Sequence, residues 1–127
     1  MDWLALVALA ALLQYFYFGI LVGRSRTRTG IAAPAVTGDP VFERTFRVQQ
    51  NSLEQLVIFL PAAYLFAHYV SAMMAAAIGV LYVVGRAVYA AGYIHDANDR
   101  GKGFLLTVLA QAVLVTGSLF GALRAIL

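Results

Sequence analysis

The sequence predicts an all-α protein, an integral membrane protomer built as a four-helix bundle. Composition is the first observation: of the 127 residues, 62% are hydrophobic and only 12% are charged, and the mean hydropathy is +0.81. A soluble domain of this length needs more polar surface to cover its core. Secondly, the apolar stretches are long enough to cross a bilayer, which takes about 20 helical residues. We expect a single domain over residues 1–127, embedded in the lipid bilayer.

The four spans are expected at about residues 3–22, 41–70, 72–94 and 104–127. Between the first two, arginines, glycines and prolines predict a basic loop over residues 23–40. The link between the second and third spans has no charged residue and is expected to be tight. The stretch 95–103 predicts a polar turn before the last span.

The distribution of basic residues predicts the orientation in the membrane. The first connection carries Arg24, Arg26 and Arg28, and the third carries Arg100 and Lys102, whereas the second carries none. Basic loops stay in the cytoplasm. The first and third loops are therefore expected inside and both termini outside, in the inner membrane if the source is bacterial. The net charge of +3 forms no continuous stripe, so no nucleic-acid partner is expected.

One polar stripe falls in the first half of the second span. Arg47, Asn51 and Glu54 are spaced i, i+4 and i+7, which places them on one helical face, and Gln49 and Gln50 add amides nearby. A charge at membrane depth costs about 2.5–3.5 kcal/mol on insertion scales, so it needs a partner or a wet cavity. The stripe indicates either a hydrogen-bond network between helices or a site for a zwitterionic ligand.

A second stripe falls on the third span. Arg86, Tyr89 and Tyr93, with Arg100 beyond them, share one face if the helix continues into the polar turn. Arg86 could instead form an ion pair with Glu54 at a comparable depth. The tyrosines could equally be interfacial aromatics, and Arg100 a loop charge that only sets the orientation.

The chain contains no cysteine, so a thiol nucleophile would have to come from a ligand. The two histidines, His68 and His95, lie far apart in the sequence, and no metal site is expected.

Residues 42–54, Phe-Glu-Arg-Thr-Phe-Arg-Val-Gln-Gln-Asn-Ser-Leu-Glu, resemble the signature of the MAPEG family, the membrane-associated proteins of eicosanoid and glutathione metabolism. The pattern Glu-Arg-x-x-Arg-x-x-x-Asn-x-x-Glu is matched at every fixed position. The pattern Arg86-x-x-Tyr89-x-x-Gly92-Tyr93, followed by Arg100, resembles the leukotriene-forming synthases of this family. The resemblance covers essentially the whole chain and extends to the microsomal glutathione transferases.

The resemblance implies a homotrimer with glutathione bound between neighbouring subunits near the cytoplasmic face. The residues that it assigns to glutathione are Arg47, Gln49, Asn51, Glu54, Arg86, Tyr89 and Tyr93. It places Arg100 beside the sulfur as the catalytic residue. Arg26 and Arg28 are rivals for a thiol-side or second-substrate role, because the basic residue of the first loop cannot be aligned uniquely. Gln55 stands where the synthases carry a tyrosine after the signature Glu, a departure expected to weaken glutathione binding.

The predicted function is a membrane-bound glutathione transferase that conjugates the glutathione thiolate to a lipophilic electrophile, with glutathione-dependent peroxide reduction as a second activity. A guanidinium beside the sulfur would favour the thiolate, and arginine keeps its charge when partly desolvated. Glutathione is expected as co-substrate and no metal is expected. A non-catalytic lipid-binding or scaffold protein of the same fold is the alternative. An ion-coupled carrier is also conceivable, although the sequence shows no internal repeat.

Overall fold

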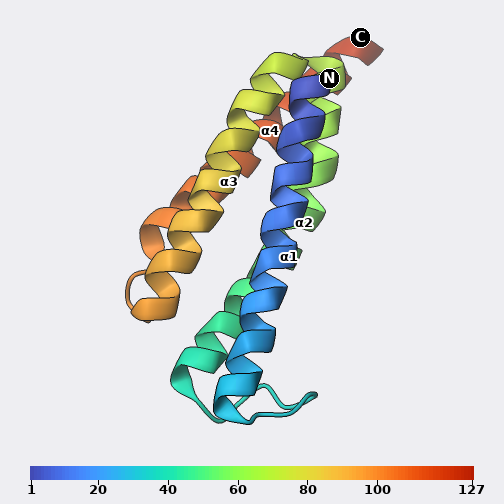
Figure 1. The fold of residues 1–127 in the computed structure, drawn as a ribbon. Coiled ribbons are helices and arrows are strands. Elements are labelled where there is room, and N and C mark those ends of the chain that lie inside the picture. Colours follow the sequence, from blue (N-terminus) through green and yellow to red (C-terminus); the bar gives the residue numbers. More distant parts are fainter.

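The chain folds into four long helices joined by short connections (Figure 1). The computed structural model describes residues 1–127, with α1 over Asp2–Thr29, α2 over Pro40–Tyr69, α3 over Ala72–His95 and α4 over Gly101–Ile126. It contains no strand, so the all-α prediction is confirmed. Figure 1 shows both termini at one end of the bundle, as expected for four helices that alternate in direction.

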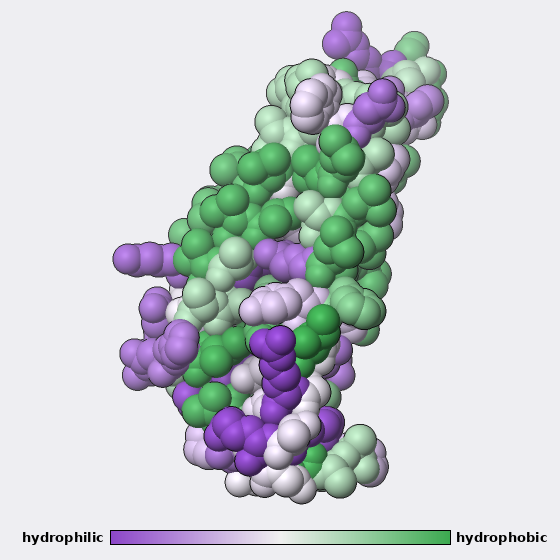
Figure 2. Space-filling view, viewed as in Figure 1, coloured by the Kyte–Doolittle hydropathy of each residue, from purple (hydrophilic) through white to green (hydrophobic).

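Three of the helices, α1, α3 and α4, are long and apolar enough to cross a membrane. The exception is α2, which has 30 residues and a length of about 45 Å, but whose first half is polar. The molecular surface shows a related division (Figure 2): a hydrophobic band covers the middle and upper part of the bundle, and most hydrophilic residues gather towards the end that holds the loop between α1 and α2, with a few more at the end that holds the termini. The protein is therefore an integral membrane protein, in which α2 carries the polar surface.

The first helix is longer than the apolar run that predicted it. It continues to Thr29 and carries Arg24, Arg26 and Arg28, which were expected in a loop beginning at residue 23. Arginine is a good helix former, so nothing in this stretch stops the helix. It ends at Gly30, which adopts the left-handed conformation with φ 76°.

The starts of α2 and α3 are capped by side chains. The Asp39 carboxylate accepts the backbone N–H of Phe42 at 2.9 Å, and Pro40 begins the first turn. The N–H of Phe42, and to a lesser extent the Arg28 guanidinium, hold the pKa of Asp39 below its usual value. The Ser71 hydroxyl accepts the backbone N–H of Met74 at 3.2 Å. The link between α2 and α3 is thus as short as expected.

The main apolar core lies in the half of the bundle near the termini, and a smaller buried cluster that includes Phe18, Val48 and Tyr89 lies in the other half. Phe59 of α2 stacks on Tyr82 of α3, with ring centroids 3.9 Å apart and planes 1° from parallel. Leu4 of α1 and Leu114 of α4 are fully buried in the same cluster. Lipid tails are as apolar as these side chains, so close packing rather than exclusion of water holds the helices together in a bilayer.

The last two helices cross closely at a pair of glycines. A Cβ added to Gly103 of α4 would lie against the backbone nitrogen of Tyr89 on α3 and 2.7 Å from the carbonyl oxygen of Gly85. Small residues permit this approach of two backbones. Because Gly103 lies three residues after Arg100, the crossing brings Arg100 close to Tyr89.

We predict that Gly103→Ala destabilises the protein. Its new methyl group would meet backbone atoms, which cannot rotate away, so α4 must move off α3 at a cost of about 1–3 kcal/mol. Thermal unfolding of the detergent-solubilised protein should show a lower Tm. The matched control is Gly101→Ala, where a Cβ would have no atom within 4 Å. The control should keep or slightly raise the Tm, because alanine favours a helix over glycine. Equal Tm values for the two variants would contradict the close crossing.

Candidate functional site

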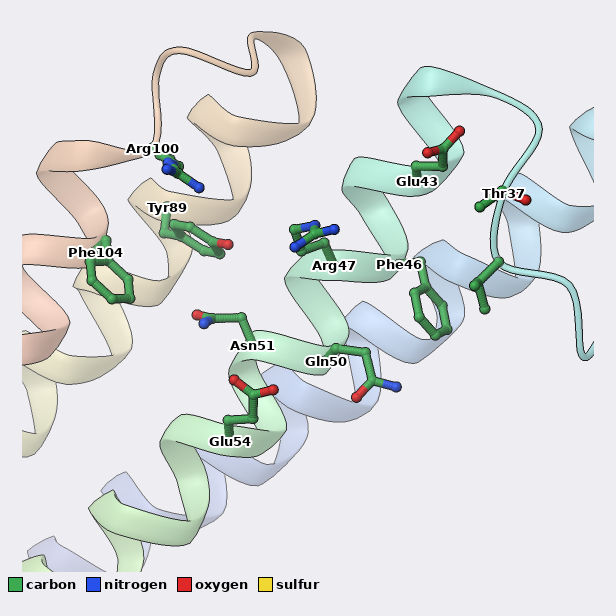
Figure 3. Close-up of a pocket in the computed structure, with 11 residues that line it drawn as sticks. Thr37, Glu43, Phe46, Arg47, Gln50, Asn51, Glu54, Tyr89, Arg100 and Phe104 are labelled. Carbon is green, nitrogen blue, oxygen red and sulfur yellow. The ribbon is translucent and has the colours of Figure 1, made fainter.

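A cavity of about 640 Å³ opens between α2 and the pair formed by α3 and α4 (Figure 3). It lies on the polar half of α2, away from the main apolar core. Its lining residues are Val36, Thr37, Glu43, Phe46, Arg47, Gln50, Asn51, Glu54, Tyr89, Arg100 and Phe104. Five of the residues predicted for the site, Arg47, Asn51, Glu54, Tyr89 and Arg100, are therefore brought together by the fold.

One wall of the cavity is a single face of α2. Glu43, Arg47 and Glu54 alternate in charge along this face and are exposed in the cavity. Asn51 lies between Arg47 and Glu54 and points towards the opposite wall (Figure 3). Its Oδ1 atom is buried and has no hydrogen-bond partner within the chain. The wall thus offers a cation, two carboxylates and a free acceptor in a line.

The opposite wall comes from α3 and α4. Tyr89 and Arg100 point towards Arg47, and Phe104 lies beside Tyr89, with ring centroids 6.3 Å apart (Figure 3). The expectation that Arg100 would continue the helical face of Tyr93 is wrong. α3 ends at His95, and Arg100 is the N-cap residue of α4. Its side chain therefore reaches the cavity from the turn between the two helices.

A third side of the cavity is formed by Val36 and Thr37, in the loop between α1 and α2. Arg26 holds this loop by donating from Nη1 to the carbonyl oxygen of Ala35 at 2.8 Å. Arg28 pairs with Asp39 across 3.4 Å. Arg26 and Arg28 are the two candidates for the thiol-side or second-substrate role. Both support the loop, and neither lines the cavity of its own chain.

Three other predicted residues lie outside the cavity. Gln49 lies on a different side of α2, in a groove with residues of α1. Tyr93 is buried and stacks on Tyr89, with centroids 5.5 Å apart. Arg86 is fully buried, and its Nη2 donates to the Ser52 hydroxyl at 2.8 Å. The suggested ion pair between Arg86 and Glu54 does not form, since the single ion pair of the chain is the one between α1 and the N-cap of α2.

Several cavity residues were not singled out by sequence reasoning. Glu43 precedes Arg47 by four residues, so the helical period already places it on the same face. Phe104, in the first turn of α4, follows Arg100 by four residues, so the helical period likewise predicts that it lies on the same side as Arg100. Val36 and Thr37 carry no such signal, because the path of a loop is not periodic.

Two arginines join α2 to α3 around this cavity. Arg86 of α3 reaches Ser52 of α2, as described above. Further along, Arg44 of α2 donates from Nε to the carbonyl oxygen of Ile94, in the last turn of α3, at 3.1 Å. The cavity lies beside the stretch of α2 that these two contacts fix against α3.

Comparison with known proteins places the chain in a family. The model of the MAPEG family matches residues 4–120. An uncharacterized protein of Synechocystis is 44% identical over 121 residues, which cover 95% of this chain and 88% of the relative. Microsomal glutathione S-transferase 2 of Homo sapiens is 38% identical over 120 residues, with coverage of 94% and 80%. Leukotriene C4 synthase of Rattus norvegicus is 32% identical over 132 aligned positions, with coverage of 98% and 88%. A match over nearly all of its length shows that the chain belongs to the MAPEG family.

Proposed function

We propose that this protein is a membrane-bound glutathione transferase, which joins the sulfur of glutathione to a lipophilic electrophile. Relatives named as glutathione S-transferases support this activity. The observation that carries the proposal is the charge pattern of the cavity. Arg47 and Glu54 lie seven residues apart on one wall, and Arg100 faces them from the other.

The α2 wall suits a zwitterionic tripeptide. Glutathione carries two carboxylates and one ammonium, so Arg47 can pair with a carboxylate and Glu54 with the ammonium. The helix rises about 10 Å between these two residues, close to the reach of about 10 Å for three extended residues. Between them, the unpartnered Oδ1 of Asn51 can accept a peptide N–H. An unmade hydrogen bond at a buried acceptor costs about 1–3 kcal/mol, which such a ligand would remove.

Arg100 is the proposed catalytic residue. A free thiol has a pKa of about 8.5, so only a few per cent is thiolate at neutral pH. A guanidinium next to the sulfur lowers this pKa by about 1–3 pH units, and the N-terminus of α4 adds a favourable dipole. The thiol proton leaves to solvent. The thiolate then forms a sulfur–carbon bond with the electrophile, and the electron pair of the bond that breaks goes to the leaving group.

The apolar part of the lining suits a lipophilic second substrate. Phe46, Phe104 and Val36 line the same cavity as the charged groups, so an apolar electrophile could lie beside the sulfur. A hydroperoxide could react at the same thiolate. That reaction consumes two glutathione molecules, whose thiols are oxidised to a disulfide while the hydroperoxide is reduced to an alcohol and water.

We expect a homotrimer with glutathione between subunits, and Gln49 supports this assembly. Gln49 shares a groove with Tyr15 and Gly19 of α1 and does not reach the cavity of its own chain. It can contact glutathione, as the family resemblance implies, only if this groove faces the cavity of a neighbour. The number three comes from the family resemblance alone, and on that basis native mass spectrometry from detergent should show trimers. Monomers that bind glutathione as well as the assembled protein would contradict the assembly.

The proposed orientation has the first and third connections in the cytoplasm and both termini outside. It rests on the positions of the basic residues and agrees with the placement of both termini at one end of the bundle. The chain has no cysteine, so single cysteines can be labelled without background. Lys102→Cys should react with an impermeant maleimide only from the cytoplasmic side, and Leu127→Cys only from outside. The reverse pattern would overturn the orientation.

The two walls of the cavity should respond differently to mutation. Arg100→Ala should raise the pKa of the bound thiol and lower turnover, with little change in glutathione affinity. Arg47→Ala and Glu54→Gln should weaken binding first, by about ten- to a hundredfold, because each removes a charge-assisted contact. Arg100→Lys should restore turnover only in part, since a point charge replaces a planar fork.

The measurements are ultraviolet absorbance of the thiolate against pH and isothermal titration with glutathione. Arg124→Ala is the matched control, since it removes an exposed arginine at the far end of α4. An unchanged thiol pKa and unchanged turnover in Arg100→Ala would refute the catalytic role. Wild-type protein that binds glutathione without turnover would favour the non-catalytic alternative.

A further inference from the structure

Arg86 is the one charged side chain buried in this bundle. It is 0% exposed, although it lies in a helix that is apolar enough to cross the membrane. One of its nitrogens, Nη2, donates to the Ser52 hydroxyl, while Nε and Nη1 have no partner. No carboxylate pairs with it. A buried charge with unmade hydrogen bonds is costly, so its presence calls for a compensating role.

The guanidinium lies behind the cavity wall. Its central carbon is 4.3 Å from the centroid of the Tyr89 ring. Tyr89 lines the cavity, whereas Arg86 does not. On its other sides the Tyr89 ring stacks on Tyr93 and leans against Phe104. Arg86 therefore supports Tyr89 from the side away from a ligand.

The same guanidinium also fixes the opposite wall. Ser52, which accepts its hydrogen bond, is the residue after Asn51 and two residues before Glu54. A hydrogen bond at Ser52 limits rotation of the α2 turn that carries both of these cavity residues. Arg86 thus contacts Tyr89, which belongs to one wall, and Ser52, which lies behind the other wall. It reaches neither Glu54 nor the cavity itself.

We propose that Arg86 is a positioning residue, which sets the Tyr89 ring and the Asn51–Glu54 turn of α2 for glutathione without touching the ligand. The inference rests on the proposed function and deepens it. It differs from direct binding of glutathione by Arg86. It also differs from a purely structural brace. Two of the three guanidinium nitrogens are buried without a partner, so this side chain costs stability rather than adding to it. Function, rather than stability, then accounts for the charge at this position.

The test compares Arg86→Met, Arg86→Lys and Ser52→Ala in the full-length protein, with thermal unfolding and glutathione titration on the same samples. Arg86→Met should keep or raise the Tm, because it removes two unpaired donors, yet raise the Kd for glutathione by about ten- to a hundredfold through misplacement of the site. Arg86→Lys keeps a cation over the ring and should recover part of the affinity. Ser52→Ala should also weaken binding, and its Tm should fall, because it leaves the third nitrogen of the buried guanidinium without a partner.

The bound thiol offers a second readout. Its pKa should stay unchanged in Arg86→Met, because the variant disturbs binding and leaves Arg100 in place. Gln14→Leu is the matched control: it removes a helix-to-helix hydrogen bond of 2.9 Å, from Gln14 to the carbonyl oxygen of Val83, outside the cavity. It should leave the Kd unchanged.

Three outcomes would overturn this role. A lower Tm or failure to fold in Arg86→Met would make Arg86 a structural brace. An unchanged Kd in Arg86→Met and Ser52→Ala, with wild-type binding intact, would show that it does not position the site. Absence of glutathione binding by the wild type would overturn the proposed function itself, and with it this inference.

Discussion

The polar face of α2 has to be accommodated in a bundle whose three other helices are apolar enough to face lipid. Charged groups such as Arg47 and Glu54 are costly in hydrocarbon, so the face must meet partners or enclosed water. The bundle meets this requirement by leaving a cavity beside the first half of α2 and packing its second half tightly, around the stacked rings of Phe59 and Tyr82. The same constraint thus divides the molecule into a site and a core.

The close crossing of α3 and α4 completes that site. Gly85 and Gly103 let the two backbones approach, and the turn before α4 then holds Arg100 near Tyr89 and opposite α2. Small residues at the crossing therefore shape the cavity as well as the packing. Arg86, buried one turn from Tyr89, links this pair of helices to α2 with a single hydrogen bond at Ser52. Because Arg86 makes only some of its possible hydrogen bonds, it lowers the stability of the fold. Such a costly group is expected where a site has to be held in place.

The sequence by itself determined the features that depend on one helix at a time. Hydropathy and length identified the helical membrane class, and the helical period alone placed Arg47, Asn51 and Glu54 on one face. The motif of residues 42–54 identified the family, which the match to the family model confirms. The end of α1 was misplaced, because Gly23 and three arginines resemble a loop in composition, whereas the helix stops only at Gly30.

Only the tertiary structure decided which side chains meet across helices. Arg86 could have paired with Glu54 by depth alone, but the rotation of α2 presents Ser52 to it instead. Arg100 reaches the cavity from the start of α4, because α3 ends before it. Thr37 enters the wall through the path of a loop. Periodicity along a chain fixes the direction of each side chain about its own helix axis. The crossing and rotation of neighbouring helices depend on close packing at points such as Gly103, which no single helix encodes.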